Sequence, residues 1–142
     1  MARTVIEFPA QSHFSTDYTI LIGDINSADH LGADRLFSIL IEAQMRFIYS
    51  LGYPDRHRIA GSRYIVADTE FVFRSESHHG DQLRIDVAVA NVGGKGFELL
   101  FRFYNSTRDA LAALAKVGVV FVDYETGRPQ AVPEEFLARF GG

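Results

Sequence analysis

One twelve-residue segment gathers most of the side chains that could do chemistry. Residues 23–34 (GDINSADHLGAD) hold three aspartates, an asparagine, a histidine and two glycines, and they join a strand-like segment to a helical one. Backbone N–H groups at the start of a helix lack partners within the helix, and the helix dipole favours negative charge there. The segment could therefore stabilise an oxyanion that forms when a carbonyl group is attacked. Asp, Asn, Ser and Gly are also ordinary turn and capping residues, so a purely structural interpretation stays open.

The helix that follows this segment is predicted to span Ala33 to Leu51. Gly52 is a stop signal just beyond it, and Asp34 suits the positive end of the helix dipole. Apolar side chains occupy almost the whole circumference and leave only a narrow polar stripe, formed by Asp34, Ser38, Glu42, Arg46 and Ser50. A surface helix would carry a wider polar face. We therefore expect protein to surround this helix on most sides.

Alternating apolar residues predict strands on both sides of the helix. The first strand is expected over residues 12–25, and later strands over 63–74, 83–89, 97–103 and 111–124. Residues 91–96 (NVGGKG) are typical of a hairpin turn. Residues 109–116 also have helical propensity, but a strand from Leu111 to Tyr124 would pair along its whole length. Residues 133–140 are predicted to form a short terminal helix.

The order of these elements predicts the fold class. One apolar helix packed against one curled antiparallel sheet is an α+β two-layer fold, and 142 residues make a single domain, residues 1–142. Twelve Phe and six Tyr indicate a large apolar interior, an aromatic interface, or both.

The composition also excludes several classes of function. The net charge is −4 and no basic cluster occurs, which argues against nucleic-acid binding. Cysteine is absent, which excludes disulfides and thiolate nucleophiles. The longest apolar run is far short of the roughly 20 residues of a membrane span. The N-terminal residues lack the apolar core of a signal peptide, so a cytoplasmic protein is expected.

The motif G-D-x-N-x-x-x-H-L-G-x-D, followed by a helix with the pair Glu42-Ala43 and a closing Leu-Gly, resembles the hotdog-fold acyl-CoA thioesterases of the 4-hydroxybenzoyl-CoA thioesterase type. The later segments ADTEFVFRSES, HGDQLRIDVAV and KVGVVFVDYETGRPQAVPEEF follow the same order, so the resemblance covers residues 12–137. It implies a hotdog fold, with a curled sheet wrapped around one long central helix. It also implies hydrolysis of an acyl-CoA or related acyl thioester to a free acid and a thiol.

The resemblance assigns catalytic roles to three residues. Many of these thioesterases carry D-x-D in the loop, and the second Asp is the nucleophile or general base. Asn26 stands at that place, and an amide cannot take a proton or form a mixed anhydride, although it can orient a water or the carbonyl. His30 matches the loop histidine of the family. Glu42 matches the helix glutamate, and unless it is paired its apolar surroundings would raise its pKa and make it a candidate general base.

Three further residues are implied to bind the substrate. Gly32 falls where its backbone N–H could face the thioester, and Ala33 begins the helix beside it. Asp24 is expected at the site as a brace for the loop. The resemblance further implies a homodimer or homotetramer whose site closes between subunits, with no cofactor other than the coenzyme A of the substrate.

Other interpretations of these residues remain open. Glu42 could simply pair with Arg46 one turn along the helix. Gly23, Asp24 and Asn26 also match the G-D-x-N-x-x-H motif of hotdog enoyl-CoA hydratases, although His30 comes one residue late. The missing carboxylate at Asn26 also allows a third function, a non-catalytic acyl-thioester binding protein.

A pair of adjacent histidines with a nearby aspartate could suggest a metal site. His78 and His79 lie close to Asp81, but such a pair between two strands more often forms a solvated turn. We therefore expect no metal site there.

Overall fold

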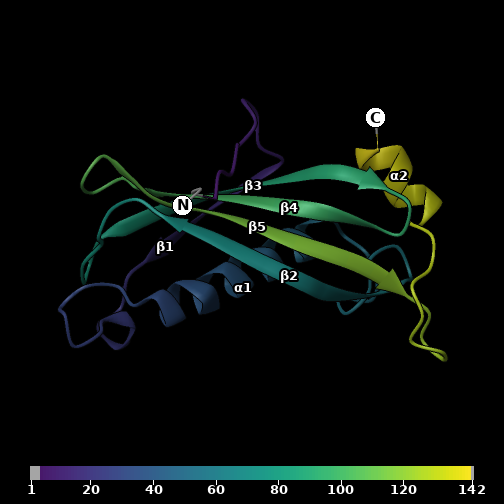
Figure 1. The fold of residues 1–142 in the computed structure, drawn as a ribbon, viewed down its shortest axis with the longest axis horizontal. Helices are drawn as coiled ribbons and strands as arrows, with labels where there is room; N and C mark the ends of the chain where they lie inside the picture. Colours follow the sequence, from purple (N-terminus) through teal and green to yellow (C-terminus); the bar gives the residue numbers. More distant parts are fainter. Residues whose placement is uncertain (1–3, 142) are drawn as a thin grey trace.

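The computed structural model describes residues 4–141, which form one antiparallel sheet and two α-helices (Figure 1). In chain order the elements are β1 (Phe14–Thr19), the 3-10 helix η1 (Ile22–Asp24), α1 (Ala33–Ser50), β2 (Arg63–Phe73), β3 (Gln82–Gly93), β4 (Gly96–Asn105), β5 (Ala110–Val122) and α2 (Glu134–Phe140). The strand order is β1-β3-β4-β5-β2, so β1 and β2 are the two edges.

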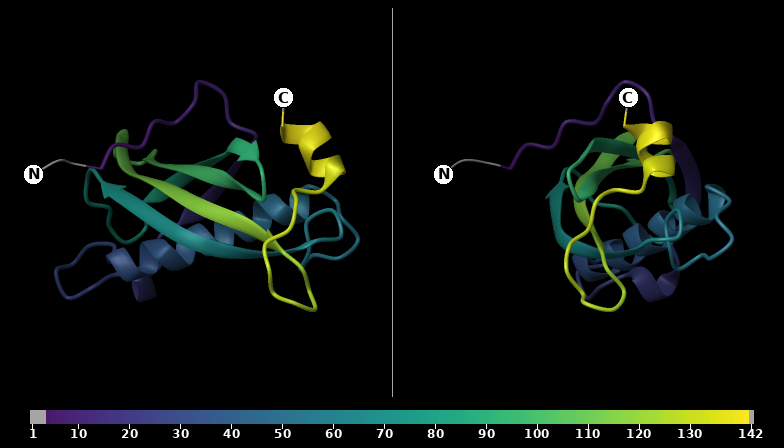
Figure 2. Two further views of the ribbon diagram at one scale, coloured as in Figure 1. Left: turned by 45° about the vertical axis from the view of Figure 1, so that its right-hand side comes forward. Right: turned by 90° about the vertical axis from the view of Figure 1, so that its right-hand side faces the viewer.

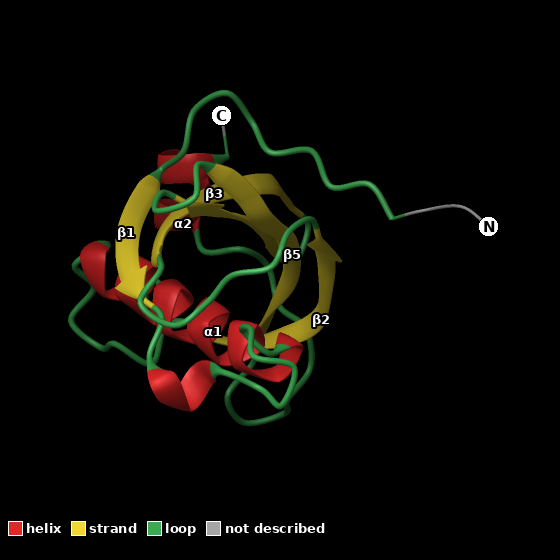
Figure 3. Cartoon of the chain, turned by 90° about the vertical axis from the view of Figure 1, so that its left-hand side faces the viewer, coloured by secondary structure: helices red, strands yellow, loops and turns green. Residues whose placement is uncertain are grey.

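The core lies between α1 and the concave face of the sheet. Alternate residues of β3, namely Leu83, Ile85 and Val87, are at most 1% exposed, and Leu40 and Phe47 of α1 belong to the same core. The period-2 alternation of a strand turns every second side chain toward the helix. Viewed along the helix, the sheet curves over α1 (Figure 3). The predicted α+β fold, with a curled sheet around one long helix, is confirmed.

The hairpins follow the predicted turn chemistry. β3 and β4 are joined where Gly93 pairs with Gly96, and Gly94 takes a φ of 57°, which glycine adopts without strain. β5 begins at Ala110 and pairs with β4 on one side and β2 on the other. The strand interpretation of residues 109–116 is therefore confirmed.

The first strand is shorter than predicted. β1 ends at Thr19, because the chain turns into η1 three residues later. The carboxylate of Asp24 accepts a hydrogen bond from the amide of Leu21 at 2.9 Å, which stabilises this turn. The strand was predicted too long because the apolar alternation in the sequence continues past Thr19. Ile22 belongs to this alternation, yet it is 70% exposed.

The helix α1 is also less enclosed than predicted. Phe37, Ile41 and Tyr49 are 41%, 46% and 44% exposed, so protein does not surround the helix on this side. The reason is that α1 packs under the sheet, and this stripe is only partly covered, by Phe71 of β2 near Phe37 and by Arg56 over the ring of Tyr49. No helix among residues 4–141 is long and apolar enough to cross a membrane.

Two segments complete the fold around the sheet. The N-terminal segment, residues 4–12, crosses the face of the sheet opposite α1, where Ile6 and Phe8 pack with Ala88, Leu100 and Leu114 (Figure 2). At the other end of the chain, Phe136 of α2 is fully buried against Phe97 and Phe121, with ring centroids 4.6 and 5.8 Å away. α2 thus closes the end of the curled sheet.

Candidate active site

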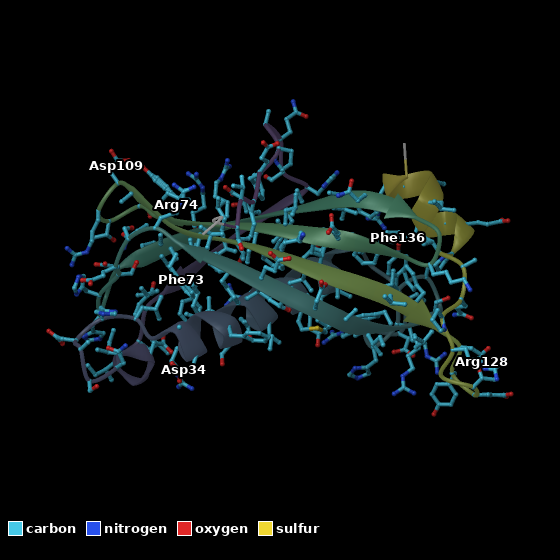
Figure 4. The ribbon with its side chains drawn as sticks, in the orientation of Figure 1. Asp34, Phe73, Arg74, Asp109, Arg128 and Phe136 are labelled. Atoms are coloured by element: carbon cyan, nitrogen blue, oxygen red, sulfur yellow. The ribbon has the colours of Figure 1, made fainter. Side chains whose placement is uncertain are left out.

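A cleft of about 360 Å³ opens at the N-terminal end of α1. One wall is the end of the β1–α1 loop with the first turn of α1, and the other is the start of the β2–β3 loop. The lining residues are His30, Leu31, Gly32, Ala33, Leu36, Phe73, Arg74, Ser75, Glu76, Ser77 and Ala112. Figure 4 shows Phe73 and Arg74 at the same end of the molecule as Asp34, far from Phe136. The loop singled out in the sequence therefore meets a second loop about 45 residues further along the chain.

A buried polar network holds the two walls together. The amide of Leu31 donates a hydrogen bond to the carbonyl of Ser77 at 2.8 Å. Ser77 is 2% exposed, and its hydroxyl accepts a hydrogen bond from Nδ2 of the fully buried Asn105 at 3.0 Å. The same Nδ2 donates to Asp81 Oδ2 at 2.9 Å. Buried polar groups that are fully satisfied in this way rigidify their surroundings.

Asp81 is the charged centre of this network. Burial opposes its ionisation, but hydrogen bonds from Arg108, Asn105 and the amide of His78 outweigh burial and hold the pKa of Asp81 below its usual value. His79 and Gly80 form an exposed turn, as predicted for the histidine pair, whereas Asp81 just after them is 4% exposed. His78 Nδ1 lies 3.2 Å from the carbonyl of Asp29. Within residues 4–141, no three Cys, His, Asp or Glu side chains are grouped to hold a metal ion.

His30 lies at the mouth of the cleft with its two ring nitrogens in different surroundings. Nδ1 lies 3.2 Å from the carbonyl oxygen of Leu31, and Nε2 lies 3.8 Å from Oε1 of Glu76. A neutral imidazole that donates its Nδ1–H to this carbonyl keeps a lone pair on Nε2. That nitrogen can act as a general base. Sequence reasoning missed Glu76, because no motif or spacing links it to residue 30.

The start of α1 offers hydrogen-bond donors without side-chain caps. No side chain caps α1, and the amide of Gly32 donates to the carbonyl of Asp24 at 3.2 Å. The expectation that the Gly32 N–H faces the substrate therefore needs correction, because a protein acceptor already uses it. Ala33, the first residue of α1, lines the cleft and carries the next N–H. A Cβ at position 32 would lie only 2.5 Å from Oδ1 of Asp34, so glycine at this position avoids a close contact with the Asp34 side chain.

Asn26 shapes the loop rather than lining this cleft. Its side-chain Oδ1 accepts hydrogen bonds from the backbone N–H groups of Ala28 at 2.9 Å and His30 at 3.5 Å. The backbone N–H of Asn26 donates to the backbone carbonyl of His30 at 2.9 Å. Its side chain borders a smaller pocket of about 230 Å³ beside the helix start, together with Asp24 and Arg35. Asn26 and His30 thus belong to one turn but line different pockets: His30 lines the cleft, and Asn26 lines the smaller pocket.

Asp24 is fully engaged with protein groups. Its carboxylate accepts hydrogen bonds from the Tyr18 hydroxyl at 2.8 Å and from the Leu21 amide at 2.9 Å, and Arg35 Nε lies 3.6 Å away. Burial, together with the hydrogen bond to Asp24, raises the pKa of Tyr18 to about 12. These contacts fit a brace for the loop, as expected, and leave the carboxylate little access to a substrate.

Glu42 does not line the cleft. Its Oε2 accepts a hydrogen bond from Arg46 Nε at 2.8 Å, and the side chain is 54% exposed, so the premise of an isolated carboxylate in apolar surroundings is wrong. Arg46 Nη1 also donates to Thr16 Oγ1 and to the carbonyl of Asp17, both at 2.8 Å. Because Glu42 comes six residues after Leu36, the last α1 residue that lines the cleft, it lies about 9 Å further along the helix.

The sequence of the chain also carries the signature of one family. The profile of the Thioesterase-like superfamily matches residues 20–140, which include both walls of the cleft. The chain belongs to the thioesterase-like superfamily. None of the curated protein sequences compared with the chain is a significant match.

Solved structures with the fold of this superfamily are similar over most of the chain. A 1,4-dihydroxy-2-naphthoyl-CoA thioesterase from Synechocystis aligns with a TM-score of 0.78 and 15% identity, covering 88% of this chain and 93% of that one. The protein SAV2348 from Staphylococcus aureus, solved in complex with CoA, gives 0.79 and 20% identity, covering 97% and 85%. A 12:0-ACP thioesterase from Umbellularia californica gives 0.79 and 14%, covering 90% and 49%. At these identities the similarity concerns the fold, and the predicted hotdog fold is confirmed.

Proposed function

We propose that this protein is an acyl-CoA thioesterase that works as a cytoplasmic homodimer and releases a free acid and coenzyme A. One observation carries the proposal. In a chain of the thioesterase-like superfamily, a cleft places a histidine with a free ring nitrogen beside the uncapped start of a long helix. A base and an oxyanion site are the two groups that thioester hydrolysis by water needs.

The proposed reaction uses His30 as the base. Nε2 takes a proton from a water molecule as the water oxygen bonds to the thioester carbon, and the carbonyl electron pair moves to the oxygen. The N–H of Ala33 and the dipole of α1 stabilise this oxyanion. When the oxyanion collapses, the C–S bond breaks, and the leaving thiolate takes the proton from the His30 imidazolium. Asn26 and Asp24 hold the loop in this proposal, and Glu42 lies outside it.

The acyl group would rest on the apolar part of the cleft. Leu31, Leu36, Phe73 and Ala112 supply this surface, and Phe73 is 57% exposed. The ring of Phe73 stacks on Phe71 with a centroid distance of 5.7 Å and an interplanar angle of 10°. Burial of the acyl chain against these side chains would contribute affinity in proportion to the apolar area removed from water.

Exposed apolar residues support the dimer. Phe37 and Ile41 on α1 are 41% and 46% exposed, and Ile65 and Val66 on β2 are 46% and 45% exposed. The α1 stripe lies beside β2, because the rings of Phe37 and Phe71 are 5.8 Å apart. Apolar area of this kind, next to an edge strand with an unpaired backbone, is a liability in a monomer.

A two-fold axis would cover both features at once. Antiparallel pairing of β2 with the β2 strand of a second copy satisfies the free edge, and the two α1 stripes then meet across the axis. The cleft begins at Phe73, the last residue of β2, so each cleft would border the interface. The proposed dimer thereby completes the walls of both sites.

The test is thiol release from a panel of acyl-CoA thioesters of different chain length and aromatic content. The chain contains no cysteine, so a thiol-specific chromogenic reagent would report only the CoA released. We expect turnover for at least one member of the panel, and a fall of about 100-fold or more in His30→Gln, the scale of losing a general base. Binding without turnover would support an acyl-thioester binding protein instead. Loss of the crotonyl-CoA absorbance without thiol release would support a hydratase.

A further inference from the structure

The β2–β3 loop places a second ionisable side chain in the cleft, and no sequence motif assigns it a role. Glu76 Oε1 lies 3.8 Å from His30 Nε2, the nitrogen that acts as the base in the proposed reaction. We propose that Glu76 and His30 together hold the attacking water, and that the Glu76 carboxylate stabilises the imidazolium once His30 has taken the proton. The kinetic part of this proposal rests on the proposed hydrolysis, whereas the pairing of the two side chains can be tested without turnover.

The separation of the two atoms suits this role. A distance of 3.8 Å is too long for a direct hydrogen bond, and one water can bridge polar atoms at such a separation. A water held there donates one hydrogen to Nε2 and the other to the carboxylate. The oxygen lone pair of that water then points away from both acceptors. It is thus available to a thioester carbon in the cleft.

The backbone on each side of Glu76 is anchored. Before it, the amides of Arg74 and Ser75 both donate to the carbonyl of Ala112, at 2.9 and 3.2 Å. After it, the carbonyl of Ser77 accepts the amide of Leu31 at 2.8 Å, which ties the loop to the residue next to His30. The position of Glu76 is therefore set by its neighbours, although its side chain is 68% exposed. That exposure means that solvent screens the pair, so its effects are moderate.

Arg74 is the other charged residue that lines the cleft, and it lies on the β2–β3 loop with Glu76. Asp34, in the first turn of α1, borders the smaller pocket instead. On the other side of the turn, the backbone carbonyl oxygen of Asp29 lies 3.2 Å from Nδ1 of His78. Within the described part of the chain, Glu76 is the one carboxylate within 4 Å of a His30 ring nitrogen. Substitution of Glu76 therefore tests the His30–Glu76 pair without changing the other charged groups.

The first test is the NMR spectrum of the His30 ring nitrogens at one fixed neutral pH, assigned with His30→Gln. Removal of the carboxylate in Glu76→Gln should change the chemical shift of Nε2, because this nitrogen loses the charged group 3.8 Å away and the water held between them. Glu76→Asp should recover part of this change. The matched control is Glu125→Gln, which removes an exposed carboxylate from the loop after β5 and should leave the His30 signals unchanged. An unchanged Nε2 signal in Glu76→Gln would overturn the pairing.

The second test is the steady-state rate with whichever acyl-CoA of the panel is turned over. In Glu76→Gln we expect kcat to fall about tenfold, less than the loss on removing a general base. Glu76→Asp should restore part of the lost kcat, and Glu125→Gln should leave kcat unchanged. An unaltered kcat in Glu76→Gln would overturn the role in holding water. If the wild-type protein releases no thiol at all, the proposed function fails, and the NMR spectra still decide the pairing.

Discussion

The side-chain oxygen of Asn26 accepts the amide of Ala28 at 2.9 Å, and this bond closes the turn that presents His30. A carboxylate can make the same contact, so we expect Asn26→Asp to keep the fold and to change kcat by less than about threefold. Asn26→Ala removes the acceptor, and local side-chain bonds of this kind define such turns. We therefore expect about a tenfold loss of kcat in Asn26→Ala, measured by thiol release.

The Asn26→Asp variant also discriminates between two views of the natural chain. A several-fold rise in hydrolysis would show that the site can use a carboxylate at this position and that the natural protein is a weak enzyme or a binder. Circular dichroism and the unfolding midpoint of both variants serve as controls for folding.

Because Glu42 pairs with Arg46, we expect its substitution to affect turnover far less than it would if Glu42 were the general base. Because Glu42 is exposed, pairs with Arg46 and lies about 9 Å along the helix from Leu36 of the cleft, Glu42→Gln should lower kcat by less than about threefold. Steady-state kinetics at pH 7 with the best substrate of the panel provide the measurement. A fall of two orders of magnitude, as expected of a general base, would mean that Glu42 acts in the cleft of the partner copy.

The apolar stripe on α1 predicts the effect of a charge at the interface. Ile41→Glu should convert the dimer to a monomer, because it would bury an unpaired carboxylate between two copies. Light scattering at micromolar concentration measures the mass, and thiol release should fall with it. Val5→Glu is the control, since Val5 is 76% exposed and belongs to the N-terminal segment. A monomeric wild-type protein, or a dimeric Ile41→Glu variant, would contradict the proposed interface.

The lowered pKa of Asp81 predicts a pH-dependent contribution to stability. A carboxyl group whose folded pKa lies below its unfolded value of about 3.9 stabilises the fold above that pH, and the effect is lost as the pH falls through the folded pKa. Asp81→Asn should therefore lower the free energy of unfolding by about 2 kcal/mol at pH 7, the scale of hydrogen bonds to a charged group. The difference from wild type should shrink below about pH 4.

Urea unfolding at a series of pH values measures this contribution. Asp109→Asn is a suitable control, because Asp109 is exposed at the β4–β5 turn and has a φ of 53°, which asparagine also tolerates. A constant difference between wild type and Asp81→Asn from pH 7 to pH 3 would contradict the assignment.

Local patterns were sufficient to predict most of the fold. The bounds of α1, Ala33–Ser50, agree with the predicted helix to within one residue, because a glycine follows the apolar pattern closely. The strand at 110–122 could be predicted because its partner strands needed a long neighbour. The end of β1 could not be predicted, because the turn at Leu21 depends on its hydrogen bond to Asp24 and not on a break in the apolar pattern.

The candidate site was less accessible to sequence reasoning. His30 and Ala33 lie in the local motif, and the structure places both at the cleft. The pairing of Glu42 with Arg46 follows the i,i+4 spacing of a helix and was one of the open alternatives. Glu76 approaches His30 only because Leu31 and Ser77 join two distant loops, and a tertiary contact of this kind leaves no periodic signal in the chain.

The segment of residues 4–12 would bear on any assembly larger than the proposed dimer. Ile6 and Phe8 already lie across the outer face of the sheet, and the guanidinium of Arg102 stacks on Phe8 at 4.5 Å. Two dimers that stacked sheet against sheet would therefore meet through these added side chains instead of through bare strands. The contact surface of such an assembly would then be set by residues 4–12 and not by the strands themselves, so a substitution at Ile6 or Phe8 would change assembly without touching the cleft.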